Sequence, residues 1–194
     1  MKSMLSFVVA ACCLATFPPQ ESAPAKQTAD GRYALEAILV LTPEQCSVKT
    51  KKGNLMVKTE KFDMKELLCP AAESAVQQVF EKYTRVETPP EKGSAPGRLI
   101  LTPKLVDLEA TMTATAFGKR KMVLLVEWTA TDETGKVCWV QTVEGNAKEK
   151  MGNLFTGGKH QRKMLEAIRK DLADKSAQAM RQSGELQKLA QKAR

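Results

Sequence analysis

The chain has 194 residues, 43% of them hydrophobic and 27% charged, which excludes a wholly disordered protein and leaves room for one domain of ordinary size with short additions. The formal net charge is +8, and residues 159–194 supply +6 of it, because ten Lys/Arg accompany four Asp/Glu there. A single histidine, His160, excludes every mechanism that needs two imidazoles from this chain, including a His-rich zinc centre.

The N-terminus has the pattern of an export signal. Lys2 is followed by an uncharged, largely apolar run over residues 4–17, which is shorter than the roughly 20 residues of a membrane span and matches the h-region of a signal peptide. Within this run, Val9-Ala10-Ala11-Cys12 resembles the lipobox of bacterial lipoproteins. The resemblance implies that Cys12 is acylated and becomes the first residue of the mature protein.

Two other outcomes stay open for this segment. Only about eight apolar residues precede Cys12, Val9 stands where a lipobox usually has leucine, and a second cysteine, Cys13, follows. Ordinary cleavage near Ala23 or Ala25 would release a soluble secreted protein. Failure of cleavage would leave the segment as an anchor.

Residues 33–62 predict β-structure. The run Tyr33–Leu41 is compact and apolar between Gly31 and Pro43, which favours a first strand, although its Ala and Leu content also allows a short helix. Turn residues at 52–54 lie between two short β-compatible pieces and indicate a hairpin.

A helix should follow this hairpin. Asp63 and Glu66 have the spacing of a capping box, and the apolar residues after them recur at helical spacing. Pro70 has no N–H and suits the first turn of a helix. We therefore expect it to start the main helix body, about 71–82, and to leave 63–69 as a separate turn.

An alternation of apolar and polar residues over 106–116 is the strongest pattern in the chain. It places the apolar side chains, Val106 included, on one face of a long half-buried strand. Leu99 and Leu101 have the opposite phase, so the pattern also indicates a bulge or bend near Pro103.

Two more strands should complete a three-stranded meander. We expect residues 118–121 to turn the chain and 122–131 to return as a strand. A second turn over 132–135 then leads to a strand over 137–144. The glycine-rich residues that follow, 145–158, are expected to form a loop.

Residues 159–182 predict a long amphipathic helix with one apolar and one basic face. Lysine and arginine side chains acting together bind phosphate or carboxylate groups, so the basic face and a basic triplet in the meander are candidates for anion binding. These residues are Lys119, Arg120, Lys121, Lys163, Lys170, Arg181 and Lys188. The alternative is a solvated helix face that serves only solubility.

The elements together predict an α+β domain. Its sheet should be antiparallel, or mixed, with four to five strands that include the meander, and two helices should pack on one face. We expect a signal peptide over 1–23, or over 1–11 if the lipobox is used, and a flexible tether over 24–32. The domain should span 33–182 and precede a basic C-terminal tail over 183–194.

Three cysteines lie beyond the N-terminal segment. Export permits a disulfide, and Cys46 with Cys69 could close a loop of about 24 residues. The alternative is that both are buried free thiols.

Cys138 lies in a strand pattern, which indicates a small buried side chain rather than a nucleophile. The three cysteines include no C-x-x-C pair, which disfavours a zinc site.

The sequence contains no motif that identifies an enzyme. Gly152–Lys159 resembles a phosphate-binding loop, but the spacing differs by one residue and His160 stands where Ser or Thr would hold magnesium. We therefore expect a connector there, a solvated His160, no catalytic residue, no metal and no cofactor. Trp128 and Trp139 lie in apolar strand patterns, and an exported protein does not meet nucleic acid, so no nucleic-acid partner is expected.

The order of the elements resembles that of small bacterial envelope lipoproteins, namely the YajG-like group and the auxiliary lipoproteins of lipid-transport and lipopolysaccharide-assembly machines. Val9 to Cys12, Tyr33-Ala34-Leu35, the meander over 99–144 and the helix from Lys159 carry the resemblance. It implies a non-enzymatic docking or assembly module, held at the periplasmic face of a bacterial membrane by its N-terminal lipid, that binds an envelope protein or an anionic lipid. The alternative is a secreted soluble domain that binds a ligand or acts as an inhibitor.

Overall fold

The structure is a computed structural model that describes residues 31–46, 63–94, 97–112, 119–150 and 157–192. The elements of these residues are, in chain order, β1 (Tyr33–Val40), α1 (Pro43–Cys46), α2 (Met64–Val79), β2 (Phe80–Val86), β3 (Leu99–Met112), β4 (Lys119–Thr131), β5 (Val137–Lys150), α3 (Gly157–Gln182) and α4 (Gly184–Lys192). The predicted signal peptide, the acylated Cys12, most of the tether and the hairpin around 52–54 lie outside the described residues, so they stay predictions.

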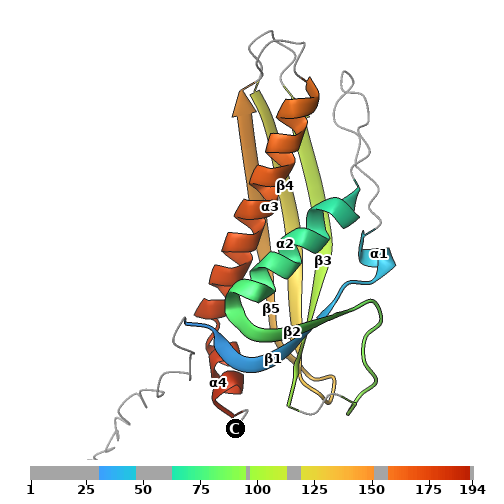
Figure 1. Ribbon diagram of the computed structural model, residues 1–194, viewed down its shortest axis with the longest axis vertical. Helices are drawn as coiled ribbons and strands as arrows, with labels where there is room; N and C mark the ends of the chain where they lie inside the picture. Colours follow the sequence, from blue (N-terminus) through green and yellow to red (C-terminus); the bar gives the residue numbers. More distant parts are fainter. Residues whose placement is uncertain (1–30, 47–62, 95–96, 113–118, 151–156, 193–194) are drawn as a thin grey trace, which may run out of the picture.

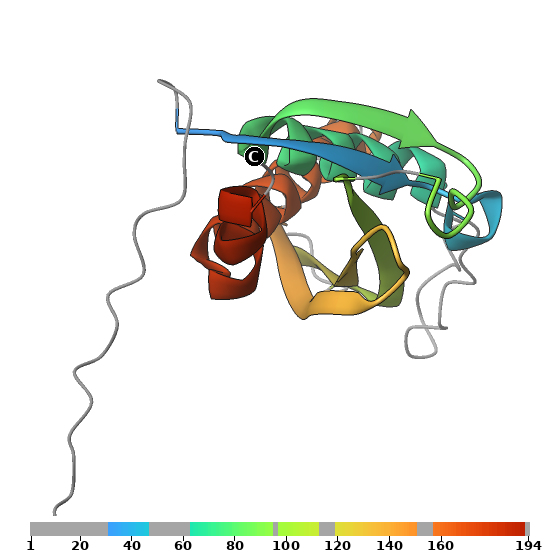
Figure 2. The ribbon, with the colours of Figure 1, turned by 90° about the horizontal axis from the view of Figure 1, so that it is seen from below.

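The five strands form one mixed sheet with the order β2-β1-β3-β4-β5. β1 pairs in parallel with both β2 and β3, while β3, β4 and β5 form an antiparallel meander. The meander runs along the length of the molecule with α2 and α3 in front of it (Figure 1). Seen from below, the sheet curves, and α3 and α4 lie beside β5 (Figure 2). The predicted α+β class, with helices on one face of a mixed sheet, is confirmed.

The hydrophobic core lies between α2, α3 and the sheet face that they cover. The alternation predicted for β4 is confirmed. Its buried apolar residues on this face are Met122, Leu124, Val126, Trp128 and Ala130. The indole Nε1 of Trp128 donates a hydrogen bond to Ser176 Oγ of α3 at 3.0 Å, so a polar group buried in the core has its partner.

α2 runs without interruption through Pro70, so the expected break there is wrong. Asp63 caps the helix as predicted, because its Oδ1 accepts from the Lys65 N–H at 2.9 Å. Pro70 cannot donate to the Glu66 carbonyl four residues earlier, and Arg169 Nη1 of α3 donates to that carbonyl at 3.5 Å instead. A neighbouring helix thus satisfies the carbonyl group that the proline leaves without its usual donor.

β2 was not expected from the sequence. α2 ends at Val79 rather than near residue 82, because Phe80 takes extended backbone angles of φ −113° and ψ 139° and begins the strand. Phe80 is buried, but all the later residues of β2 are exposed or half-buried. The strand therefore lacks the regular alternation that identifies a strand in a sequence.

β3 contains the predicted bulge at a different residue. Its register with β4 shifts between Leu105 and Asp107, so the bulge lies at Val106 and not at Pro103. Val106 was expected on the apolar face but is 55% exposed, whereas Leu108 is buried. One extra residue in the strand thus joins the two opposite phases of the pattern.

The β4–β5 hairpin is longer than predicted. Residues 119–121, expected in a turn, begin β4, and residues 145–150, expected in a loop, end β5. Residues 119–121 pair in register with 148–150, and residues 122–124 pair with 145–147. The close approach of α3 explains why the strand has a glycine at position 145. A Cβ added there would lie 2.9 Å from the Cβ of Leu172.

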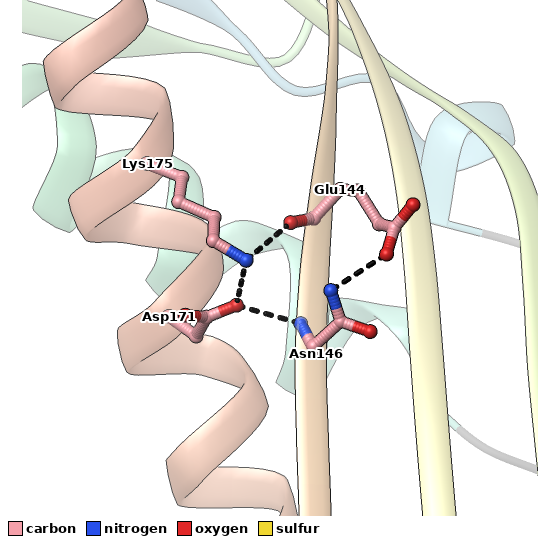
Figure 3. Close-up of polar contacts among 4 residues, drawn as sticks. All are labelled: Glu144, Asn146, Asp171 and Lys175. Carbon is pink, nitrogen blue, oxygen red and sulfur yellow. Dashed lines mark hydrogen bonds and ion pairs between the residues drawn. The ribbon is translucent and has the colours of Figure 1, made fainter.

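α3 covers the open edge of β5. Asp171 Oδ2 accepts from the Asn146 backbone N–H at 2.7 Å, and Lys175 Nζ donates to the Glu144 carbonyl at 3.1 Å (Figure 3). The same lysine pairs with Asp171 at 2.8 Å, and Asn146 Nδ2 donates to Glu144 Oε1 at 2.6 Å. These contacts occupy backbone groups that an edge strand would otherwise offer to another chain.

The segment expected as a basic tail, 183–194, is instead helical over most of its length. Ser183 Oγ accepts from the Leu186 N–H at 3.2 Å and caps the start of α4. Leu186 and Ala190 are buried in the main core. The domain therefore continues to Lys192.

Candidate functional site

A cavity of about 220 Å³ is lined by residues from the starts of β1 and β3, the β4–β5 turn and α4. These segments lie at the lower end of the molecule in Figure 1. Its floor is apolar, because Leu35 and Leu99 are buried and Leu189 packs against the core. The charged residues that line it are Arg98, Asp132, Glu133 and Lys192. An apolar floor with polar groups around it is the general form of a binding site.

The β4–β5 turn forms a fixed wall of this cavity. Asp132 Oδ1 accepts from the Thr134 hydroxyl at 2.6 Å, the Thr134 N–H at 2.9 Å and the Lys136 N–H at 3.0 Å. These hydrogen bonds, that of the hydroxyl first, lower the pKa of Asp132 and keep its carboxylate charged. Gly135 completes the predicted turn with a φ of 81°, which glycine adopts without strain.

The residues just before β3 are attached to the same turn. The Gly93 N–H donates to the Glu133 carbonyl at 2.8 Å, and the Gly97 N–H donates to the Glu133 carboxylate. Arg98 Nε pairs with Glu36 Oε2 of β1 at 3.1 Å. The rim of the cavity is therefore held in place by contacts between three separate segments, which favours a preformed site over one that forms on binding.

A second hollow, of about 310 Å³, lies between α2 and α3. Arg169 and Lys170 line it together with Glu166 and Asp174. Arg169 is already engaged with backbone carbonyl oxygens, and Gln78 Nε2 of α2 donates to Asp174 Oδ1 at 3.3 Å. The positive and negative side chains that line this hollow balance in charge, and several already form hydrogen bonds. The hollow is therefore a polar contact region between the two helices.

The structure divides the predicted anion-binding residues between different parts of the molecule, because Lys119, Arg120, Lys121 and Lys163 lie near the starts of β4 and α3 and the other three lie further along α3 and in α4. Lys163 and Lys170 are exposed along α3, but Arg181 lies near its other end and Nη2 of this arginine donates to the Gln78 carbonyl at 2.6 Å. Lys188 belongs to a different helix, α4. The basic triplet lies at the start of β4, where Lys121 is exposed and the side chains of Lys119 and Arg120 lie outside the described part. Anion binding by these residues stays a prediction.

The predicted disulfide between Cys46 and Cys69 stays a prediction as well, because the side chain of Cys46 lies outside the described part. Cys69 is buried in α2. Cys138 is half-buried on β5, where burial raises the pKa of its thiol and Sγ donates to the Lys136 carbonyl at 3.4 Å. A raised pKa keeps this thiol protonated, which disfavours a role as a nucleophile, but the side chain is only half-buried where the sequence predicted a buried one.

Over the described residues, no group of three His, Cys, Asp or Glu side chains is arranged to hold a metal ion. The helices of this same part include none that is long and apolar enough to span a membrane. Sequence reasoning missed the cavity, because its floor combines Leu35, Leu99 and Leu189 from three distant segments. Alternation in the strands could have identified the first two as buried, but nothing local places them beside Leu189.

No protein-family model matches the sequence, and no curated protein matches it significantly. Solved structures of similar fold include a minor lipoprotein from Acinetobacter baumannii, with 10% identity and a TM-score of 0.48 over 78% of this chain and 91% of that one. Another is protein XCC0632 from Xanthomonas campestris, of the family DUF330, with 7% identity and a TM-score of 0.44 over 83% of this chain and 86% of that one. These similarities are distant and concern the fold alone.

Proposed function

We propose that this protein is an exported envelope lipoprotein, held at a membrane through an acylated Cys12, whose domain recognises an envelope partner without catalysing a reaction. The observation that carries the proposal is the order of the N-terminal features. An apolar run over residues 4–17 contains Ala10-Ala11-Cys12, residues 18–32 offer little to bury, and a folded domain begins at Tyr33. The acyl chains would provide attachment, the segment before β1 would set the reach, and the domain would supply recognition.

The cavity at the lower end is the site that best supports recognition of a protein. Its volume of about 220 Å³ is below the roughly 300–1,000 Å³ of sites that enclose a whole small molecule. It suits one apolar side chain of a partner, placed on Leu35, Leu99 and Leu189, with Arg98 and Glu133 beside it for polar contacts. The size of the cavity therefore favours a protein partner over the alternative of a secreted domain that carries a small ligand.

Metabolic labelling with palmitate and intact-mass measurement of the mature protein test the attachment. We expect a labelled protein whose mass corresponds to an acylated N-terminal Cys12. The label should disappear in Cys12→Ser and persist in the matched control Cys13→Ser. A mature N-terminus after Ala23, or full-length protein left unprocessed inside the cell, would contradict the proposal. Turnover of a substrate by the purified protein would contradict its non-enzymatic part.

A further inference from the structure

Positive charge is concentrated at the end of the molecule opposite the cavity. β4 begins, β5 ends and α3 begins at this upper end (Figure 1). We call residues 119–121, 148–150 and 157–163 the basic tip. They include eight Lys/Arg and one Glu, whereas the rest of the described part has fourteen Lys/Arg and eighteen Asp/Glu. The domain is therefore electrically polar, with a basic tip on an otherwise acidic body.

The strand register at the tip places like charges opposite one another. Lys121 pairs with Lys148, and two residues further along Lys119 pairs with Lys150. Lys121 and Lys148 are both exposed. Like charges directly opposite in adjacent strands destabilise a sheet. These two lysine pairs, at successive positions on one face of the sheet, do not stabilise the fold, so stability does not explain them. An anionic partner would relieve the repulsion between the lysines.

The start of α3 adds to the same charge. Arg162 and Lys163 are exposed in its second turn. The sequences that adjoin the tip segments, 113–118 and 151–156, contain no acidic residue. The tip lies about 45 Å from the β4–β5 turn, because β5 has 14 residues and a strand rises roughly 3.3 Å per residue. The described chain begins at the lower end of the molecule, as that turn does (Figure 1).

We propose that the basic tip binds the phosphate groups of an anionic phospholipid surface. This deepens the proposed function by naming one partner of the domain, and it rests on that function for the exported location. Six of the eight cations are lysines, which act as point charges on long stems, whereas shaped carboxylate sites in proteins favour the planar fork of arginine. Neither of the two hollows described above lies at the tip. Several lysines from three segments suit a fluid layer of headgroups better than one fixed acidic side chain.

Vesicle binding of the whole mature protein tests the proposal. The probes are vesicles of phosphatidylcholine mixed with phosphatidylglycerol and vesicles of phosphatidylcholine alone. Each lysine near an anionic surface strengthens binding about fivefold, so Lys121→Gln combined with Lys148→Gln should weaken binding to the anionic vesicles about 25-fold. The matched control, Lys82→Gln with Lys136→Gln, removes the same charge away from the tip and should bind like the unmodified protein. No variant should differ on phosphatidylcholine alone.

Two further readouts distinguish an effect of the tip on binding from effects on folding and on attachment. The tip variant loses a repulsive pair, so its melting temperature should be unchanged or higher, and reduced binding cannot then be ascribed to unfolding. An acyl chain at Cys12 contributes equally to every variant, so failure of palmitate labelling would refute the attachment and leave this comparison intact.

Equal binding of the tip and control variants to anionic vesicles would overturn the lipid proposal in favour of an acidic protein partner. Complete displacement by inorganic phosphate at constant ionic strength would also overturn it, in favour of a site for the free anion.

Discussion

Gly145 lies where α3 passes close to β5. The Cβ that any other residue would add there sits 2.9 Å from the Cβ of Leu172, and Leu172 is itself buried. Neither side can move without shifting the helix or the strand, because both belong to a closely packed core. The position therefore requires the absence of a side chain rather than the freedom of a turn.

Gly145→Ala should lower the free energy of unfolding by about 1–3 kcal/mol, the usual cost of overpacking a core. Denaturant unfolding followed by circular dichroism measures the change. Gly184→Ala is the matched control, since a Cβ at that position meets nothing within 4 Å, and it should not destabilise the protein. Equal stability of the two variants would show that the approach of α3 to β5 is looser than the structure has it.

At the scale of the secondary-structure elements, α2 tolerates Pro70 because of its neighbour. Arg169 of α3 reaches the Glu66 carbonyl that the proline cannot serve, and Pro70 itself is exposed. An exposed proline in a helix interior costs up to about 3 kcal/mol relative to alanine, and the arginine recovers only part of this. The helix thus persists although its local sequence opposes it.

Pro70→Ala should raise the free energy of unfolding by about 1–3 kcal/mol, because alanine restores the backbone hydrogen bond to Glu66 and removes the ring. Chemical denaturation is again the measurement. Arg169→Gln should destabilise the parent protein more than it destabilises the Pro70→Ala variant, since only the parent depends on the arginine at that carbonyl. Equal effects in the two backgrounds would refute this account of α2.

At the scale of the whole molecule, α4 completes the domain. It supplies Leu189 and Lys192 to the cavity and buries Leu186 and Ala190 in the core. The two ends of the molecule differ in character, because the cavity with its mixed rim lies at one end and the basic tip lies at the other. The two contacts proposed above, at the cavity and at the basic tip, would therefore not compete with each other.

Leu186→Ala should lower the free energy of unfolding by about 2–5 kcal/mol, the usual range for truncation of a buried leucine. Lys188→Ala in the same helix is the control, because Lys188 is exposed, and should leave stability within about 0.5 kcal/mol. Urea unfolding of both variants checks the prediction. A negligible effect of Leu186→Ala would restore the interpretation of residues 183–194 as a tail.

Local patterns were sufficient for the class of fold and for several elements. Alternation over 122–131 identified β4 and its buried face, the spacing of Asp63 and Glu66 identified a capping site although the helix body was expected only after Pro70, and the turn at 132–135 followed from its residue types. These features depend on interactions between residues near one another in the chain, so the sequence alone determined them.

Register and helix packing were decided by the tertiary structure. The bulge lies at Val106, β2 follows α2 directly, and α4 packs instead of trailing as a tail, because the burial of distant apolar residues outweighs local preference in each case. The sequence alone already showed Cys12 in its lipobox-like setting and the basic triplet at 119–121. Only the pairing of β4 with β5 set Lys121 opposite Lys148, and only the packing of α4 closed the cavity, since both bring together groups that the chain holds far apart.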